Sequence, residues 1–206
     1  MSQLGFFIDV SKCVGCKTCQ VACKDKNNLE VGRNFRHVVE YAGGDWKPLH
    51  GAWVQDVFAY YVSVACNHCA KPACAEVCPK DAISKRADNG LVLVDQNKCI
   101  GCRACEEACP YGAPQYNRAI RRMSKCDGCI DRVSAGMQPS CVDSCPQRAI
   151  EFGDIVELRR KYGTVDNLAP LPDAKTTGPS LVIRLPRLAK PLGDKSGVAF
   201  PEPAEA

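Results

Sequence analysis

Three short apolar runs, each bounded by polar or turn-forming residues, predict β-strands rather than long helices. They are Gly5–Val10, Val57–Val64 and Leu91–Asp95, and the last follows a polar turn at Asp88–Gly90. Each run ends a few residues before a group of cysteines, so we expect the strands to deliver the chain to the sites that these cysteines form. The longest strongly apolar stretch, Val57–Cys66, is about a third to a half as long as a membrane span needs. We therefore expect no direct membrane span.

After Gly163 the pattern changes, because seven of the fourteen prolines and none of the cysteines lie there. A proline-rich segment with few helix signals predicts an extended tail over 164–206, with disorder as the alternative. Within this tail, Ser180–Leu185 is apolar enough to pack against another surface. We expect the tail to wrap around a neighbouring subunit.

Residues 24–65 contain no cysteine and carry an aromatic, glycine-containing segment, Tyr41–Trp46, followed by Trp53. Such a segment can simply connect two buried strands. Aromatic side chains are also enriched at protein–protein interfaces. We expect the strand at Val57–Val64 to be buried and the aromatic loop to lie at an interface with a partner protein.

The composition narrows the range of functions. The chain has 206 residues with 16 cysteines, only 3 histidines and a formal net charge of +4. This mild positive charge does not form the basic footprint of a nucleic-acid-binding protein, so we expect no nucleic-acid partner. The N-terminus shows no basic region followed by an apolar signal core. We expect no export signal in the chain itself, and export on a partner's signal stays open.

The sixteen cysteines fall into four groups of four. The groups are Cys13, Cys16, Cys19 and Cys23; Cys66, Cys69, Cys74 and Cys78; Cys99, Cys102, Cys105 and Cys109; and Cys126, Cys129, Cys141 and Cys145. In the first and third groups the cysteines lie at i, i+3, i+6 and i+10, the run that bacterial ferredoxins use to bind [4Fe–4S] clusters. The second and fourth groups have longer gaps between their second and third cysteines, and such intervals vary among cluster-binding proteins. Four cysteines per cluster predict four clusters with no thiol left over.

The spacing in the third group has a physical reason. Three closely spaced cysteines can place their sulfurs on three irons of one cluster, and a small residue such as Gly101 lets backbone N–H groups approach the inorganic sulfides. Cys109 lies one helical turn beyond Cys105 and would point away from that cluster, and Pro110 fixes where the turn ends. In two-cluster ferredoxins such a cysteine binds the neighbouring cluster. The third group therefore predicts a second cluster nearby.

The four groups are built from two kinds of repeated half-unit. Ile8–Cys16 aligns with Val94–Cys102, which makes groups one and three one kind, although Lys24 replaces the proline that ends group three. Pro79–Ile83, which follows group two, is mirrored by Pro146–Ile150 after group four. This internal duplication predicts a repeated architecture.

Two other uses of cysteine compete with cluster binding. A disulfide framework suits small secreted chains, but cysteines at i, i+3 and i+6 are poorly placed to pair with each other. Zinc sites usually have two separated Cys-x-x-Cys pairs or include histidine. Groups two and four alone would fit a zinc site. Groups one and three would not, because a third cysteine follows at once.

The sequence offers no catalytic site beside the cysteines. It has no dinucleotide fingerprint, P-loop or nucleophile elbow, and its histidines, His37, His50 and His68, are scattered. We expect His68, between two cysteines of group two, to pack or to hydrogen-bond to a cluster sulfur, with a surface position as the alternative. The chain is therefore predicted to transfer electrons. A stand-alone polyferredoxin-like oxidoreductase is the alternative.

Basic residues flank the cysteine groups. They are Lys12, Lys17, Lys98, Arg103 and Lys125. Positive charge near a cluster favours its reduced form and raises its potential, whereas a solvated surface charge has little effect.

Several segments resemble the iron–sulfur subunit of the dimethyl sulfoxide reductase family of molybdopterin oxidoreductases. They are Phe58–Tyr61 before Cys66–Cys69, Lys125–Arg132, Tyr41–Trp46, Cys109–Tyr116 and Ala169–Asp173. The wider family includes electron-transfer subunits of polysulfide, tetrathionate, nitrate, arsenate and formate enzymes, and another member of this group is the alternative. In the nitrate reductase branch a tryptophan replaces one cysteine of the third group and leaves a three-iron cluster. Cys102 is intact here, so we expect four [4Fe–4S] clusters.

The resemblance implies an α+β fold of two ferredoxin-like dicluster domains, one inserted in the other, with an extended C-terminal tail. Residues 1–55 and 115–163 would carry groups one and four, 56–114 would form the inserted domain with groups two and three, and 164–206 the tail. The resemblance also implies cross-paired ligands. These are set 1, Cys13, Cys16, Cys19 and Cys145; set 2, Cys126, Cys129, Cys141 and Cys23; set 3, Cys66, Cys69, Cys74 and Cys109; and set 4, Cys99, Cys102, Cys105 and Cys78.

The resemblance further implies a heterotrimer with a molybdopterin catalytic subunit and a quinol-binding membrane anchor subunit that serves anaerobic respiration. The complex would be peripheral on the cytoplasmic (inner) membrane, and on its periplasmic face if exported on the catalytic partner's signal. Electrons would enter at set 4 and leave from set 1. Because the catalytic partner selects the terminal acceptor, this sequence does not reveal it.

Overall fold

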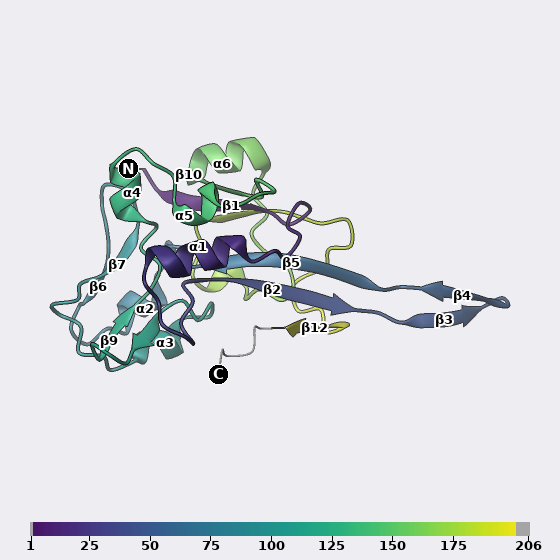
Figure 1. Cartoon of the computed structure of the whole chain (residues 1–206), viewed down its shortest axis with the longest axis horizontal. Coiled ribbons are helices and arrows are strands. Elements are labelled where there is room, and N and C mark those ends of the chain that lie inside the picture. The colour runs from purple at the N-terminus through teal and green to yellow at the C-terminus, as the bar shows by residue number, and fades with distance from the viewer. Residues whose placement is uncertain (1, 201–206) are drawn as a thin grey trace.

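The computed structural model describes residues 2–200, which form an α+β body with a long β-arm projecting from one side (Figure 1). The first sheet has the order β10-β1-β11, and contains β1 (Leu4–Asp9), β10 (Ile150–Asp154) and β11 (Leu181–Arg184). β1 runs antiparallel to β10 and parallel to β11. The strand that the sequence predicts at Gly5–Val10 is confirmed.

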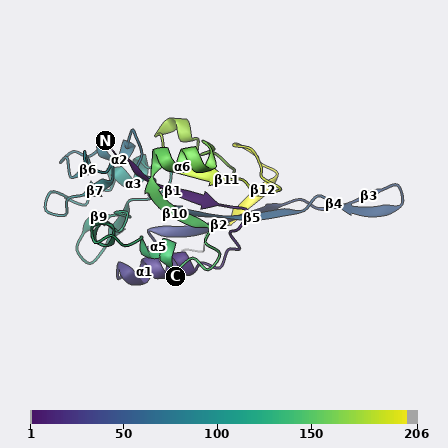
Figure 2. The same cartoon turned by 90° about the horizontal axis from the view of Figure 1, so that it is seen from above.

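Alternate residues of β1 enter different layers of the core, because successive side chains of a strand point to opposite faces. Phe6 and Ile8 lie in the main apolar core, whereas Phe7 packs with Val182 against helix α6 (Ile155–Tyr162). Figure 2 shows α6 on one side of the sheets and α1 with α5 on the other. β1 is thus buried on both faces, which explains its continuous apolar sequence.

The C-terminal segment corrects one prediction. Ser180–Leu185 does not need a neighbouring subunit to pack against, because β11 pairs with β1 and Leu181, Val182 and Ile183 are buried in the protein's own core. The expectation that this part of the tail wraps another subunit is therefore wrong. The segment also contains a 3₁₀ helix, η1, and strand β12. Their bounds are Ala174–Thr176 and Gly197–Phe200. Residues 201–206 of the predicted tail lie outside the described residues.

The arm grows out of a second sheet, ordered β12-β2-β5. β2 (Arg36–Gly43) and β5 (Phe58–Ala65) are paired antiparallel along their whole length. Beyond them the hairpin continues as β3 (Trp46–Leu49) and β4 (Ala52–Gln55), which form the tip of the arm in Figure 1. Most of β5 is buried, which confirms the predicted strand there, whereas every residue of β3 and β4 is exposed. The aromatic segment therefore lies in a projecting, exposed arm.

Short hairpins and helices complete the body. The hairpins are β6 (Ile83–Lys85) with β7 (Val92–Val94), and β8 (Gln115–Asn117) with β9 (Arg122–Ser124). The helices are α1 (Thr18–Lys26), α2 (Ala73–Glu76), α3 (Ala104–Ala108), α4 (Ile130–Ser134) and α5 (Ser140–Asp143). β7 confirms the strand predicted at residues 91–95. Within residues 2–200, no helix combines the length and apolar composition that crossing a membrane requires.

The second sheet bears on the predicted domain division. β2 lies before the predicted boundary between residues 55 and 56 and β5 lies after it, so the two predicted domains share a sheet. The nested arrangement and its boundaries stay a prediction.

Candidate metal-cluster sites

Cysteines from different groups come together in the structure. Three small cavities are lined by the four cysteines of set 1, of set 3 and of set 4, respectively. The cysteines of set 2 are close enough to affect one another electrostatically. Cys141 and Cys129 raise the pKa of Cys23, and Cys23 and Cys141 raise the pKa of Cys126. In each set three cysteines come from one group and the fourth from its partner group. All sixteen are free thiols, so the disulfide alternative is wrong. That the sets bind clusters stays a prediction.

The third cysteine of every group occupies the same local position. Each is the second residue of a short helix: Cys19 in α1, Cys74 in α2, Cys105 in α3 and Cys141 in α5. In groups one, two and three the loop before the helix carries the first two cysteines, whereas in group four helix α4 lies between them and α5. In all four groups the start of the helix positions the third cysteine. This shared geometry explains why the groups read as repeats of one unit.

Glycine in the loop before α1 is required by the backbone and by packing. Gly15 has φ +70°, a left-handed conformation that other residues adopt at a cost. A Cβ atom there would lie 2.6 Å from the ring of Tyr61 in β5. Gly101 and Gly128 hold the equivalent positions with φ of +70° and +72°. Such turns direct successive backbone N–H groups toward one point, as an anion-binding loop requires.

The mirrored segments after groups two and four make the same hydrogen bond. The backbone N–H of Ala82 donates to Sγ of Cys78, and that of Ala149 donates to Sγ of Cys145, each at 3.3 Å. Asp81 and Arg148, one residue earlier, both have positive φ. The repeated Ala-Ile after the proline therefore marks a turn that places an N–H group on the fourth cysteine.

Proline after the fourth cysteine controls where the helix ends. Cys109, before Pro110, is the C-terminal cap of α3 with extended φ and ψ of −85° and 114°. Lys24 follows Cys23 instead of proline, and α1 continues to Lys26. Cys109 therefore leaves its helix and lines the cavity of set 3.

Burial makes several of the thiols poor anions on their own. It raises the pKa of Cys13 to about 11 and the pKa of Cys23 and Cys74 to about 12. A buried thiol with a raised pKa becomes a thiolate only beside strong positive charge, which bound iron supplies. Four cysteines around a small cavity, with backbone N–H groups donating to the sulfurs of Cys78 and Cys145, fit a metal cluster.

His68 occupies the place of glycine in the loop of group two. It has φ +43° and is fully buried, so the alternative of a surface histidine is wrong. Its Nδ1 accepts a hydrogen bond from the backbone N–H of Val92 at 3.0 Å. Burial lowers the pKa of His68 well below its usual value, so the imidazole is neutral. The histidine thus ties the cysteine loop to β7.

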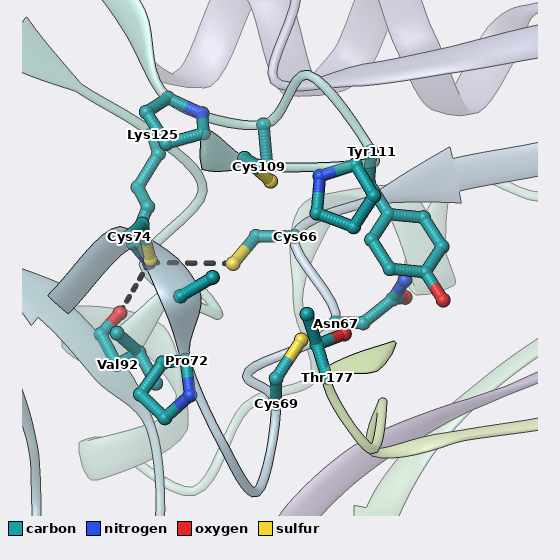
Figure 3. A pocket seen from close by; sticks show the side chains of 14 residues that line it. Cys66, Asn67, Cys69, Pro72, Cys74, Val92, Cys109, Tyr111, Lys125 and Thr177 are labelled. Carbon is teal, nitrogen blue, oxygen red and sulfur yellow. Dashed lines mark hydrogen bonds between the residues drawn. The ribbon is translucent and has the colours of Figure 1, made fainter. Parts of the chain in front are cut away.

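Of the five basic residues that flank the groups, four are exposed and Lys125 is buried. Its ammonium donates to Sγ of Cys66 at 3.3 Å, to the carbonyl oxygen of Cys126 at 3.1 Å, and to that of Val92. Figure 3 shows Lys125 reaching the cavity of set 3, with its bonds to Cys66 and Val92 dashed. Burial lowers the pKa of Lys125, but the negative charge that the neighbouring cysteines carry as thiolates, together with the bond to Cys66, outweighs burial and leaves the pKa raised.

A second buried cation, Arg36, is not among the residues predicted from the sequence. Its Nη1 donates to the hydroxyl of Ser63 at 3.0 Å, and that hydroxyl lies 3.4 Å from Sγ of Cys19. The guanidinium lies 4.6 Å from the centre of the Phe6 ring. No motif surrounds Arg36 in the sequence, and no signal there indicates that it lies beside the cysteines.

Comparisons with known proteins agree with this geometry. Residues 57–155 match the family model of a 4Fe-4S dicluster domain, and residues 4–25 match that of a 4Fe-4S binding domain. Domains of this kind and sixteen cysteines fit four [4Fe–4S] clusters, the cofactors predicted from the sequence. The models also support ferredoxin-like domains, and the mixed α and β elements agree with them.

Similar proteins match nearly the whole chain. The probable anaerobic dimethyl sulfoxide reductase subunit YnfG of Escherichia coli strain K12 is 56% identical, with 98% of both sequences covered. The B subunit of the anaerobic dimethyl sulfoxide reductase of the same strain is 56% identical, with 95% of both sequences covered. The corresponding subunit of Haemophilus influenzae is 52% identical, with 96% of both sequences covered.

Proposed function

The chain belongs to the family of iron–sulfur subunits of dimethyl sulfoxide reductase-type molybdoenzymes, and we propose that it connects a quinol-oxidising membrane anchor subunit to a molybdopterin catalytic subunit. As an electron-transfer subunit of an oxidoreductase complex, it supplies no catalytic site of its own. In the proposed heterotrimer, at the inner membrane, it serves anaerobic respiration with a sulfoxide-type acceptor.

We propose that sets 1 to 4 are the ligands of the four clusters. When bound, each cluster takes up and passes on single electrons. The protein's residues hold the sulfurs in position through the helix starts, the left-handed loop residues and the N–H groups of Ala82 and Ala149. The cavities of sets 1, 3 and 4 are mostly apolar, which limits water around the bound groups.

The observation that carries the proposed path of transfer is the exposure of two cysteines. Cys16 of set 1 and Cys102 of set 4 are exposed, whereas the other fourteen cysteines are buried or half-buried. Electron transfer between subunits requires that a carrier on each side lie close to the interface. We therefore propose that sets 1 and 4 are the two ends of the path. From the resemblance to the family, we propose that electrons enter at set 4 from the anchor and leave from set 1 to the catalytic subunit.

We propose that the projecting arm docks on the catalytic subunit. Trp46 and Trp53 at its tip are 57% and 68% exposed, more than large aromatic side chains usually are in a free subunit. The arm extends the sheet that contains Tyr61, and Tyr61 packs under Gly15 in the loop of set 1. The arm thus starts beside the proposed exit end of the molecule.

Gentle purification of the native complex tests this function. Detergent extraction should yield the protein together with a molybdopterin-containing subunit and a membrane subunit, and a quinol analogue should bleach the cluster absorbance. Recovery of the protein alone, with activity on a small substrate from an artificial donor, would instead indicate a stand-alone oxidoreductase.

A further inference from the structure

Four charged side chains are buried among residues 2–200: Asp9, Arg33, Arg36 and Lys125. Two of them have opposite charges beside them, because Asp9 pairs with Arg184 at 3.0 Å and Arg33 with Glu30 at 2.8 Å. Arg36 and Lys125 make no ion pair with a carboxylate within the described residues. A buried cation without a counter-charge is strongly destabilising, so the anionic partners of Arg36 and Lys125 must come from the cysteine sets beside them.

Arg36 lies where set 1 meets set 2. Ser63 connects the guanidinium to Cys19 of set 1. The sulfurs of Cys141, Cys126 and Cys23 of set 2 lie near enough to favour its positive charge electrostatically. Its Nε and Nη2 atoms are buried and have no hydrogen-bond partner among residues 2–200. Two of its nitrogen atoms are therefore left to donate toward an acceptor in one of these sets.

Lys125 lies where set 2 meets set 3. Its ammonium bonds to Sγ of Cys66 in set 3, and it precedes Cys126 of set 2 in the sequence and bonds to that residue's carbonyl oxygen. It also lines the cavity that contains Cys66, Cys69, Cys74 and Cys109. Lys12 and Lys98 occupy the same position before the first cysteine of groups one and three, but both are exposed. Burial, and not the motif, distinguishes Lys125.

We propose that Arg36 and Lys125 are the buried counter-cations of the row of clusters, Arg36 at the junction of sets 1 and 2 and Lys125 at the junction of sets 2 and 3. This inference rests on the proposed ligand sets. They are positioning residues: each places a fixed positive charge beside two sites that gain negative charge when an electron arrives. In a low-dielectric interior such a charge stabilises the reduced state and raises the potential of both neighbouring sites. Neither Arg36 nor Lys125 lines the cavity of set 4, so these two cations do not raise its potential in this way.

Redox titration of the purified complex, followed by electron paramagnetic resonance, tests the inference. Lys125→Met and Arg36→Met remove the charge, and Lys125→Arg and Arg36→Lys keep it. Lys98→Met is the matched control, because it removes a lysine at the same position before a first cysteine, but an exposed one. Each charge-removing variant should lower the equilibrium constant for reduction of at least one cluster about ten-fold or more, which is about 59 mV for one electron. The charge-keeping variants and Lys98→Met should retain the wild-type potentials.

Iron content separates this inference from the proposed function. A wild-type complex without iron would contradict the proposed function itself. If Lys125→Met and Arg36→Met keep their iron and their potentials do not move, the counter-cation role is wrong and the ligand sets stand. If either methionine variant loses iron, its charge-keeping counterpart shows whether the loss comes from the missing charge. Retained iron and potential in that counterpart would support the role of charge, and loss there too would overturn it.

Discussion

Cys16 and Cys102 occupy the same position in the duplicated cysteine run, and both are exposed at the surface. The apolar residues two positions before them match as well, since Val14 and Ile100 are 56% and 57% exposed. The duplication thus produces two similar surface ends, one at set 1 and one at set 4. Under the proposed function each end faces a different partner subunit, which gives the electron path a direction.

The first prediction concerns the end at set 4. Cys102→Ser should convert or remove the cluster at the entry end and block quinol-driven reduction of the terminal acceptor. Reduction driven by a dye that donates directly to the catalytic subunit should continue, because that route bypasses set 4. The two activities are measured on the same membranes, so the dye-driven rate is the internal control. If both survive unchanged, set 4 is not the entry site.

The second prediction concerns the loop at set 1. An alanine at position 15 would adopt a left-handed conformation, which costs about 1–2 kcal/mol, and its Cβ would collide with the ring of Tyr61. Gly15→Ala should therefore lower both the iron content and the midpoint of thermal unfolding. The matched control is Gly193→Ala, with φ +80° and no atom within 4 Å of the added Cβ. The control should lose only about 2–8 °C of midpoint and keep its iron. Equal behaviour of the two variants would show that the contact with Tyr61 is unimportant.

The third prediction concerns the arm. Trp46→Ala and Trp53→Ala should weaken assembly with the catalytic subunit, because both side chains project from the exposed tip. Neither substitution removes a core contact, so the iron content and thermal midpoint of the protein should stay at wild-type values. Size-exclusion chromatography of the extracted complex measures the free fraction. Trp53→Phe keeps an aromatic ring and should assemble better than Trp53→Ala. Full assembly of the double alanine variant would exclude the arm as a docking element.

The fourth prediction concerns β11. Ile183 is 1% exposed in the sheet beside Ile8, so Ile183→Ala should destabilise the protein by about 2–5 kcal/mol, a loss of roughly 4–20 °C in thermal midpoint. Leu188 lies five residues later and is 51% exposed, so Leu188→Ala serves as the control and should change the midpoint little. Calorimetry of the isolated complex compares them. A midpoint for Ile183→Ala that matches the control would indicate that β11 is not part of the core.

Local signals explain what the sequence predicted well. The strands at residues 5–10 and 57–64 are nearly continuous apolar runs. A short run of this kind is stable as a strand when it is buried on both faces or paired in a hairpin. The cysteine groups can also be recognised from neighbouring residues, because cysteines three positions apart on a loop and at the start of a helix can face the same site. The extended ψ at Cys109 follows directly from Pro110.

Long-range pairing explains what the sequence did not predict. Phe6 pairs with Leu181 across most of the chain, and no local pattern indicates that the partner of Ser180–Leu185 is the first strand rather than another subunit. Burial is also a tertiary property. Lys12, Lys98 and Lys125 look alike in sequence, and Arg36 has no motif around it, so only the folded structure separates Arg36 and Lys125 from solvated charges.

If the sixteen cysteines hold four [4Fe–4S] clusters that carry electrons, the protein contains iron and acid-labile sulfide in a fixed ratio. Iron, acid-labile sulfide and zinc analysis of the purified complex measures this ratio, after subtraction of the metal in the partner subunits. We predict about sixteen irons and about sixteen sulfides in this protein, four of each per cluster. Zinc in place of iron, in a colourless protein, would contradict it.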